Sequence, residues 1–454
     1  DPELADSDSR GRHVSVMKKN GVIMSALYGP KVMRGGREEE ARIPFTLHDG
    51  EKPGEMVMRI AGGTSVLRKG QWSDWQKVAF NIGLFRKASG MVRFYLASTG
   101  DSFSLYATPV NFDPEEPLFS ISSPASYSRT AARKYGLYPT LGMPHDTWGL
   151  QEGKLSEGAF LDQVEGVLTS RQRILRAELN KFRGGVFFFY FDTLDIVQHM
   201  FYRYCDSSSP SFEDNARFRE IINGYYEKID SIVGEVVRSV PADTTVMVLS
   251  DHGFSPFRRQ VHLNRWLEAN GFLALKPGVA DSDVMFDSVD WSRTKAYALG
   301  FGGIYINRIG RDFYGIVPEI LAHAIARELS ERLKGFRDPL DGKNIVRNVY
   351  ASPDIYTGAC VDSAPDLYVG FEPGYRASWQ TALGGVPAAL VEDNARKWSG
   401  DHLVDPSCVP GVVFSNKKIL KKDPSVLDIA PSVYALFGVR ANGMDGKDLF
   451  VNDE

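Results

Sequence analysis

Apolar and polar positions alternate through the first part of the chain, in short runs separated at roughly ten-residue spacing by Gly, Asp and Ser. Alternation is clearest at residues 57–61, 65–68, 75–82, 91–97 and 104–110, with a Gly-Gly turn at 62–63. A period of two is typical of strands that bury one face, so this pattern predicts an antiparallel sheet or sandwich. Pro114, Pro117 and Pro124 interrupt the pattern. We therefore expect a β-rich domain over residues 1–125.

The pattern is different after residue 125. Residues 160–182 and 218–240 carry apolar side chains at helical spacing, and shorter helices are expected at 263–271 and 427–437. Continuous apolar runs at 184–191, 244–250 and 411–415 are typical of strands buried on both faces. This alternation predicts an α/β core over residues 126–454, with a mostly parallel sheet and helices on both of its faces.

Composition narrows the possible functions. The chain has 454 residues, of which 43% are hydrophobic, and a formal net charge of -4, so it has no global basic field that would attract nucleic acid. No apolar run approaches the ~18 residues that cross a membrane. The three cysteines form no CxxC pair, which argues against a disulfide scaffold or a thiolate metal site. None of these features indicates a compartment.

The first candidate cluster lies at the end of an apolar run. Asp192 follows the run directly, and Asp195 and His199 come next with a spacing of four residues. In a helix, that spacing places both side chains on one face, where they can bind one ion. The alternative is structural, with Asp192 or Asp195 as a helix cap and His199 as a hydrogen-bonded core residue.

Two further clusters follow other elements of the predicted sheet. Asp251 and His252 come directly after the run at 244–250, and Gly253 permits the backbone to turn there. Asp401 and His402 lie in a loop nearer the C-terminus. Each cluster by itself is compatible with a helix cap or a solvated loop residue.

Taken together, the clusters favour a metal site. In sheets of this type, ligands bind beyond the carboxyl ends of the strands. The chain has only eight histidines, and three of them are expected at this edge with two carboxylates and no competing thiolate. This set of oxygen and nitrogen ligands suits two divalent ions of a hydrolytic centre, with zinc preferred and manganese possible.

The same motifs resemble those of a known family. The segments FDTLDIVQHMFYRY, VLSDHGF, KWSGDH, LDIAPSVYALFGV, GGIYIN and APDLYVGFEPGYR are similar to those of the alkaline phosphatase superfamily, and most similar to its type I phosphodiesterase / nucleotide pyrophosphatase branch. The resemblance covers about residues 182–449 and implies an alkaline-phosphatase-like core. The β-rich part resembles an insert that some members carry.

The resemblance also implies roles for the five residues. Asp195, His199 and His402 would hold one metal, and Asp251 and His252 the other. Asp401 and Asp192 are candidates for contacts behind these ligands. The substrate would be a small phosphate ester, possibly a nucleotide.

One expected part of the family pattern is missing from this sequence. The second metal of the family also takes an Asp at the end of the first core strand and a Thr or Ser nucleophile. The apolar strand at 22–28 ends in Gly29, and no residue here matches either role. We therefore expect a core that is incomplete at its N-terminal side, whose missing segment is needed in cis or in trans. We also expect the apolar runs at 186–191 and 246–249 to be partly uncovered.

Three other interpretations remain open at this stage. A phosphomutase of the same superfamily would need contacts that hold a phosphorylated substrate, and none is evident. A sulfatase would need a modified Cys or Ser outside the recognised motifs. A catalytically inactive metal-binding fragment or scaffold would use the β-rich domain for contacts. In each case, loops rather than the fold would decide the substrate.

Overall fold

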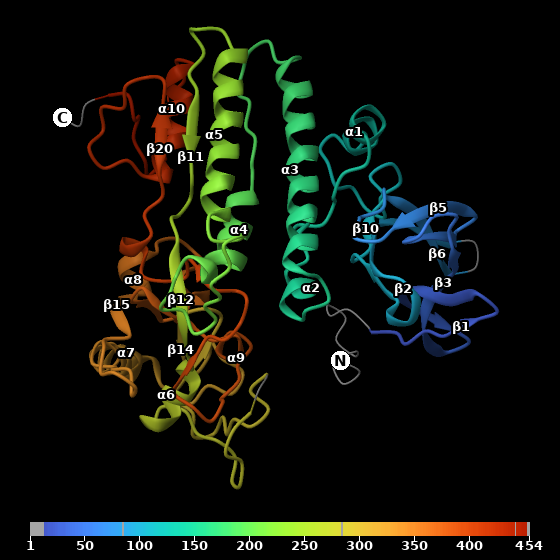
Figure 1. The fold of residues 1–454 in the computed structure, drawn as a ribbon. Helices are drawn as coiled ribbons and strands as arrows, with labels where there is room; N and C mark the ends of the chain where they lie inside the picture. The colour runs from blue at the N-terminus through green and yellow to red at the C-terminus, as the bar shows by residue number, and fades with distance from the viewer. Residues whose placement is uncertain (1–12, 84–85, 283–284, 441, 452–454) are drawn as a thin grey trace. The chain divides into compact units, whose positions relative to one another are not determined.

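A computed structural model describes residues 13–83, 86–282, 285–440 and 442–451 of the chain. The chain forms two compact units, residues 1–193 and 194–454, which are described separately (Figure 1). The predicted boundary at 125 marks the end of the β-rich pattern, whereas three helices that follow it belong to the first unit. Residues 1–12 of the predicted β-rich domain lie outside the described residues.

The first unit opens with a series of antiparallel strands. They are β1 (Lys18–Lys19), β2 (Val22–Arg34), β3 (Arg37–Asp49), β4 (Glu55–Ile60), β5 (Gly63–Arg68), β6 (Gln76–Gly83), β7 (Arg86–Val92), β8 (Phe94–Ser98), β9 (Ser104–Ala107) and β10 (Asn111–Phe112). They form sheets in the orders β1-β2-β3-β4-β5, β10-β7-β6 and β8-β9. Alternate residues of β4, Met56, Met58 and Ile60, are buried in a core that the sheets share. The predicted antiparallel β-rich part is confirmed.

Three helices complete the first unit. These are α1 (Tyr127–Tyr135), α2 (Thr147–Gln151) and α3 (Glu157–Leu179), with a short 3-10 turn, η2 (Gly100–Ser102), among the strands. The Ser156 side chain accepts a hydrogen bond from the backbone N–H of Ala159 at 3.2 Å, which satisfies a free donor at the start of α3. Phe160, Val164 and Val167 lie on the buried face of α3, as their spacing predicts.

The apolar run at 184–191 departs from the prediction. It is extended, but among the described residues it pairs with no strand. Val186, Phe188 and Tyr190 are 63%, 78% and 61% exposed. The predicted strand buried on both faces is therefore wrong for this chain, because such a run becomes a buried strand only where neighbouring strands and helices cover it. The exposure agrees with the uncovered apolar face that we expected.

The second unit mixes helices with short strands. Its helices are α4 (Thr193–Phe201, which begins at the last residue of the first unit), α5 (Ile221–Ser239), α6 (Leu263–Ala269), α7 (Glu319–Lys334), α8 (Ser352–Ile355), α9 (Trp379–Ala382) and α10 (Ile429–Leu436). Its strands are β11 (Met247–Leu249), β12 (Ser255–Val261), β13 (Ala296–Leu299), β14 (Gly303–Ile306), β15 (Val346–Ala351), β16 (Leu367–Phe371), β17 (Gly374–Ala377), β18 (Val391–Asp393), β19 (Gly400–Asp401) and β20 (Val413–Ser415). Short 3-10 turns are η3 (Tyr202–Tyr204), η4 (Val361–Ser363), η5 (Pro406–Cys408) and η6 (Val426–Asp428).

The strand pairing of this unit is mostly antiparallel. The sheets run β13-β14-β16-β15, β11-β20 and β17-β12-β18, with β19 also on β12. Among the named strands that the structure describes, only β12 and β17 pair in parallel. The molecule is mixed α/β, but the predicted mostly parallel sheet is wrong for these strands. Apolar runs show that a strand is buried without showing its direction, and β11 pairs antiparallel with β20.

Two features of this unit position the residues of interest. The buried side chains around β12, α6 and α7 form a large core that includes Val261, Leu267 and Leu329. Strand β19 pairs with the start of β12, Ser255 opposite Asp401, so the loop that carries His402 is attached to this core. Among the described residues, no helix is both long and apolar enough to cross a lipid bilayer.

Candidate metal centre

Helix α4 carries the first two predicted residues. The helix begins at Thr193, so Asp195 and His199 lie one turn apart on one face, as their spacing predicted. Nε2 of His199 lies 3.4 Å from Oδ1 of Asp195. Asp195 is in the first turn, where the helix dipole favours a carboxylate.

The turn after β11 carries Asp251 and His252. Gly253 follows them, and its backbone N–H donates to the carbonyl of Val409 at 2.9 Å. A Cβ on Gly253 would lie 2.9 Å from the carbonyl oxygen of Pro410. The glycine is therefore needed because two backbone segments approach closely; its φ is not in the left-handed region.

Short strand β19 delivers His402. A Cβ on Gly400 would lie 2.6 Å from the carbonyl oxygen of Gln198, so only glycine lets β19 lie this close to α4. The Gly400 carbonyl accepts a hydrogen bond from Nδ1 of His199 at 2.8 Å. The loop and the helix are thus joined at the residue that precedes the Asp401-His402 pair.

Three of the predicted histidines converge on one oxygen atom of Asp195, and Asp251 lies beside one of them. Nε2 of His199, His402 and His252 lie 3.4, 3.8 and 4.0 Å from Oδ1 of Asp195. Oδ1 of Asp251 lies 3.6 Å from Nε2 of His252. Potential ligand atoms of Asp195, His252 and His402 all lie within 4.8 Å of one another. We expected His252 to bind the second metal together with Asp251, and here its potential ligand atom also lies close to those of Asp195 and His402.

The hydrogen bonds of the rings leave their other nitrogens available to a metal. Nδ1 of His199 faces the carbonyl of Gly400, and Nδ1 of His252 faces the carbonyl of Gly253 at 2.9 Å. Each Nδ1 must then carry the proton, because a carbonyl oxygen only accepts, and each neutral ring therefore presents an Nε2 lone pair. Oδ1 of Asp195 is buried without a hydrogen-bond partner among the described residues. The donor set thus fits a divalent cation, which would satisfy that oxygen.

The charges of the cluster are coupled. Burial by itself raises the pKa of the Asp195 carboxyl, but the nearby imidazoles of His199, His402 and His252 outweigh this and hold its pKa below the usual value. Burial lowers the pKa of His402, and the adjacent His252 lowers it further. Both directions favour an ionised carboxylate and a neutral imidazole, which are the forms that bind metals.

Aromatic rings cover one side of the cluster. The rings of His252 and His402 stack with centroids 3.6 Å apart, and the Trp398 ring lies 3.9 Å from that of His199. Phe254 lies edge-on to His199 at 4.7 Å. The side chain of His199 is only 4% exposed, whereas that of Asp251 is 76% exposed. The cluster is therefore open to solvent on the Asp251 side.

The two carboxylates that we considered as supporting residues have different surroundings. Asp401 is buried, accepts the indole N–H of Trp398 at 2.8 Å and forms an ion pair with Arg376 at 3.0 Å. Burial raises the pKa of Asp401, but Arg376 and the hydrogen bonds outweigh it and lower that pKa. Asp192 directs both oxygens at Arg171, at 2.6 and 2.8 Å, so its carboxylate is already paired.

Sequence reasoning missed several members of the site. Phe254 lies within the segment VLSDHGF and Trp398 within KWSGDH, but neither was assigned to the metal centre. Arg376 lies at the end of the motif APDLYVGFEPGYR and was not singled out. A charged residue inside the apolar-rich strand β17 was the available signal, because a buried charge needs a partner.

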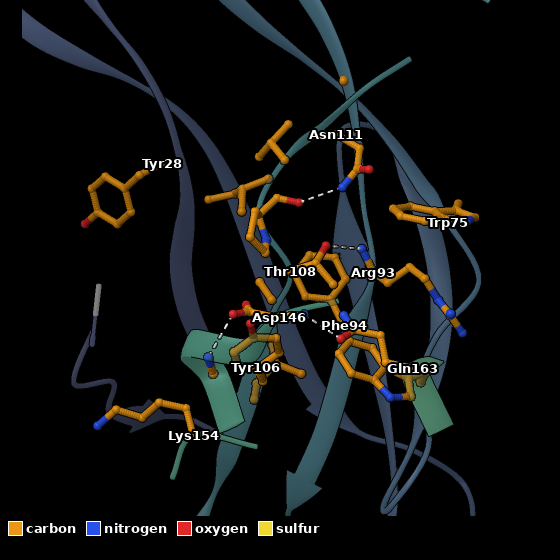
Figure 2. A pocket seen from close by; sticks show the side chains of 18 of the residues that line it. Tyr28, Trp75, Arg93, Phe94, Tyr106, Thr108, Asn111, Asp146, Lys154 and Gln163 are labelled. Carbon is orange, nitrogen blue, oxygen red and sulfur yellow. Dashed lines mark hydrogen bonds between the residues drawn. The ribbon is translucent and has the colours of Figure 1, made fainter. Parts of the chain in front are cut away.

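A second concave region lies within the first unit (Figure 2). Its volume is about 2510 Å³, larger than the ~300–1,000 Å³ of small-molecule sites. Nε of Arg93 donates to the carbonyl of Ser73 at 2.8 Å, and its guanidinium lies 5.5 and 6.0 Å from the ring centres of Trp72 and Trp75. Acidic and basic side chains both line the cavity, so its chemistry favours no single class of ligand.

The fold and the cluster together define a class: a mixed α/β protein with a histidine- and carboxylate-rich candidate metal centre. A family model described as type I phosphodiesterase / nucleotide pyrophosphatase matches residues 83–386, about two thirds of the chain. The chain belongs to this family, whose members hydrolyse phosphodiester and pyrophosphate bonds. The matched residues include Asp195, His199, Asp251 and His252, whereas His402 follows them. No curated protein and no solved structure matches the chain.

Proposed function

We propose that this protein is a metal-dependent hydrolase of phosphodiester or phosphomonoester bonds, of the nucleotide pyrophosphatase/phosphodiesterase type. One observation carries the proposal: three imidazole nitrogens surround a buried, unsatisfied carboxylate oxygen of Asp195. Family membership supports the reaction class. The substrate that we propose is a small phosphate ester such as a nucleotide.

The proposed ligands are the five residues of the cluster. Asp195, His252 and His402 are the compact group, which His199 adjoins at Asp195 and Asp251 adjoins at His252. We propose two divalent ions, with zinc preferred because imidazole and carboxylate are common zinc ligands, and manganese as the alternative. When bound, such ions supply positive charge that stabilises the charged oxygens of phosphoryl transfer.

The protein's own residues prepare this environment. The carbonyls of Gly400 and Gly253 hold the rings of His199 and His252 in one tautomer and orientation. Trp398 and Phe254 exclude water from the inner side of His199, which strengthens electrostatic interactions there. Asp251 remains on the open side, where the substrate enters.

The nucleophile belongs to the proposal as well. By resemblance to the family it is a Thr or Ser hydroxyl that forms a covalent phospho-enzyme, and we assign this role to no residue of the present chain. Metal binding and hydrolysis therefore need separate measurements.

The test begins with metal binding by the 454-residue protein. After removal of metals with a chelator, titration with Zn²⁺ and Mn²⁺ should give up to two bound ions per chain. Hydrolysis of bis(p-nitrophenyl) phosphate and p-nitrophenyl phosphate should then depend on the added metal. A protein that binds neither metal would refute the metal centre. A metal-loaded protein that cleaves neither ester, even when supplied with a nucleophile-bearing segment of the family, would refute the hydrolase.

A further inference from the structure

Arg376 is a buried charge next to the candidate metal centre. Its side chain is 1% exposed, and its guanidinium lies 4.9, 4.3 and 4.0 Å from the ring centres of Phe257, Phe301 and Trp379. Nε lies 3.0 Å from Oδ2 of Asp401, whose side chain is also 1% exposed. Aromatic faces attract a guanidinium, but they fix its position less strictly than a carboxylate does.

Asp401 in turn organises the loop that carries His402 and contacts the ring of His199. Its Oδ1 accepts the backbone N–H groups of His402 at 2.8 Å and Leu403 at 3.0 Å. The residue before it, Gly400, holds Nδ1 of His199 through its carbonyl. The Asp401 carboxylate therefore fixes the backbone that carries His402. The adjacent Gly400 carbonyl and the Trp398 indole, which donates to Asp401, both contact the ring of His199.

We propose that Arg376 is a positioning residue of the metal centre: through Asp401 it sets the orientations of His402 and His199 without touching ion or substrate. This inference rests on the proposed function, since it assigns these rings to metal binding. It adds to that function a residue on β17 that contacts none of the five ligands in the described structure.

A purely structural role explains the pair less well. Replacing a buried ion pair with apolar residues of similar volume often leaves stability unchanged or raises it. Four neighbouring aromatic rings, Trp398 among them, already provide apolar packing. What an apolar pair cannot provide is the set of directed hydrogen bonds that Asp401 accepts from backbone N–H groups of the loop.

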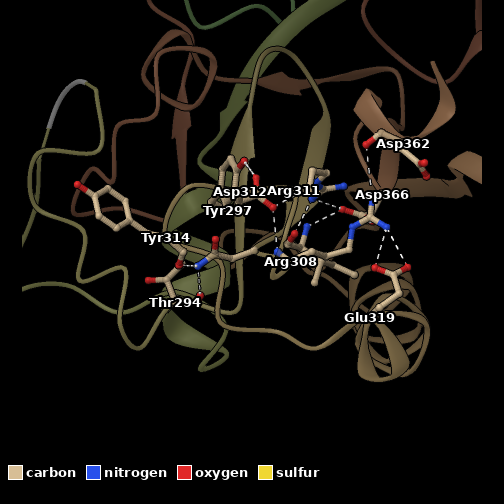
Figure 3. A network of polar contacts seen from close by, with 11 residues as sticks. Thr294, Tyr297, Arg308, Arg311, Asp312, Tyr314, Glu319, Asp362 and Asp366 are labelled. Atoms are coloured by element: carbon tan, nitrogen blue, oxygen red, sulfur yellow. Dashed lines mark hydrogen bonds and ion pairs between the residues drawn. The ribbon is translucent and has the colours of Figure 1, made fainter. Parts of the chain in front are cut away.

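The chain offers a matched control in a second arginine–aspartate pair. Figure 3 shows Arg311 and Arg308 beside Asp366, and Nη2 of Arg311 lies 2.8 Å from Oδ2 of Asp366. The Arg311 side chain is 17% exposed, and its second carboxylate partner is Asp312, at 3.1 Å. Arg311→Met thus removes a largely buried arginine from the same unit without touching Asp401.

The experiment compares the full chain with Arg376→Met, Arg376→Lys and Arg311→Met. Zn²⁺ affinity is measured by competition with a chromophoric chelator, and Co²⁺ is added for its visible ligand-field spectrum. Removing a group that supports a metal ligand typically weakens binding by about 10–100-fold. We expect that loss, with a changed Co²⁺ spectrum, for Arg376→Met. Arg376→Lys should recover part of the affinity because it keeps the charge, and Arg311→Met should bind Zn²⁺ like the parent.

Histidine ring spectra of the metal-free protein provide an independent measurement. In ¹⁵N-histidine-labelled protein, Arg376→Met should shift the ring signals of His199 and His402, and Arg311→Met should not. Unchanged ring signals in Arg376→Met would overturn the positioning role, whether or not the protein binds metal. Parental Zn²⁺ affinity in Arg376→Met would overturn that role alone, whereas a parent that binds no metal would refute the proposed function instead.

Discussion

At the scale of single residues, the candidate metal centre depends on the carboxylate of Asp195, which three imidazoles surround. Three imidazole nitrogens lie 3.4–4.0 Å from Oδ1 of Asp195, too far for good hydrogen bonds and close enough for a common cation. The neighbouring Asp251 is largely exposed, and its carboxylate lies 3.6 Å from Nε2 of His252. Loss of the Asp195 carboxylate should therefore weaken metal binding more than loss of the Asp251 carboxylate.

Asp195→Asn should weaken zinc binding by at least about a hundredfold, more than is typical for the loss of a supporting contact, because it removes the central charge. Asp251→Asn should have a smaller effect. The exposed Asp423 provides a control, since Asp423→Asn leaves the cluster untouched. Zinc titration of the three variants measures the effect, and equal affinities of Asp195→Asn and Asp423→Asn would contradict the assignment.

The sequence predicted that these residues converge, but not the contact between Arg376 and Asp401 that lies behind them. Asp195 and His199 were recognisable from helical spacing, and Asp251 and His252 from their place after an apolar run. Arg376 could not be placed, because its contact with Asp401 depends on how β17 and β19 both pair with β12. Such contacts depend on strand register, which one sequence does not reveal.

At the scale of elements, a buried histidine joins three strands. His262 directly follows β12 and is fully buried, with Nδ1 2.8 Å from Oγ of Ser378 and Nε2 3.3 Å from Glu392 on β18. Burial lowers its pKa, which the attraction of Glu392 only partly offsets, and nearby Arg265 lowers it further. These contacts indicate a structural residue rather than one that lines a cleft.

This buried ring should make stability depend on pH. In the unfolded chain its pKa is about 6.5, so below that pH the unfolded state takes up a proton that the folded state resists. Stability from His262 is thus complete above pH ~6.5 and is lost as the pH falls toward the lower folded pKa. We expect Tm to fall between pH 7.5 and 5.5, and to fall less in His262→Gln. Equal decreases in the two proteins would contradict this.

The contact between β19 and α4 can be tested with a single methyl group. In Gly400→Ala the new Cβ would meet the carbonyl of Gln198 at 2.6 Å and the Tyr202 side chain at 2.8 Å. We expect the free energy of unfolding to fall by about 1–3 kcal/mol, as in other overpacked cores, and zinc affinity to fall with it.

Gly224 in α5 is the matched control for that substitution. A Cβ there meets nothing within 4 Å, so Gly224→Ala should raise stability by about 0.5–1 kcal/mol through helix propensity alone. Chemical denaturation of both variants measures the two effects. A Gly400→Ala protein as stable as the parent would show that β19 can move away from α4.

Local sequence patterns predicted the positions of helices and strands better than they predicted which strands pair and in which direction. The alternating strands of the first unit, helix α3 and helix α5 lie close to where periodicity placed them. The run at 184–191 failed as a strand because pairing requires a neighbour, and β11 was expected in a parallel sheet yet pairs antiparallel with β20. Local spacing encodes helix and strand, whereas partners and direction depend on distant segments.

At the scale of the whole molecule, each unit exposes apolar side chains of an extended segment. In the first unit Phe188 is 78% exposed, and in the second Phe414 on β20 is 63% exposed beside Val412 at 49%. Leaving apolar surface in water costs about 25 cal/mol of free energy per Å². Adjacent exposed apolar side chains therefore favour association. Extended segments with free edges favour it further.

We therefore expect the isolated 454-residue protein to self-associate and to bind a hydrophobic dye such as ANS. Phe188→Thr combined with Phe414→Thr should reduce both effects, because threonine keeps the extended conformation and removes the apolar ring. Phe313→Thr is the control, since Phe313 is 92% exposed but belongs to neither segment. Size-exclusion chromatography with light scattering compares the three proteins.

A monomeric parent that unfolds cooperatively and binds no dye would contradict the prediction. Equal improvement in the Phe313→Thr control would show that any exposed phenylalanine has the same effect.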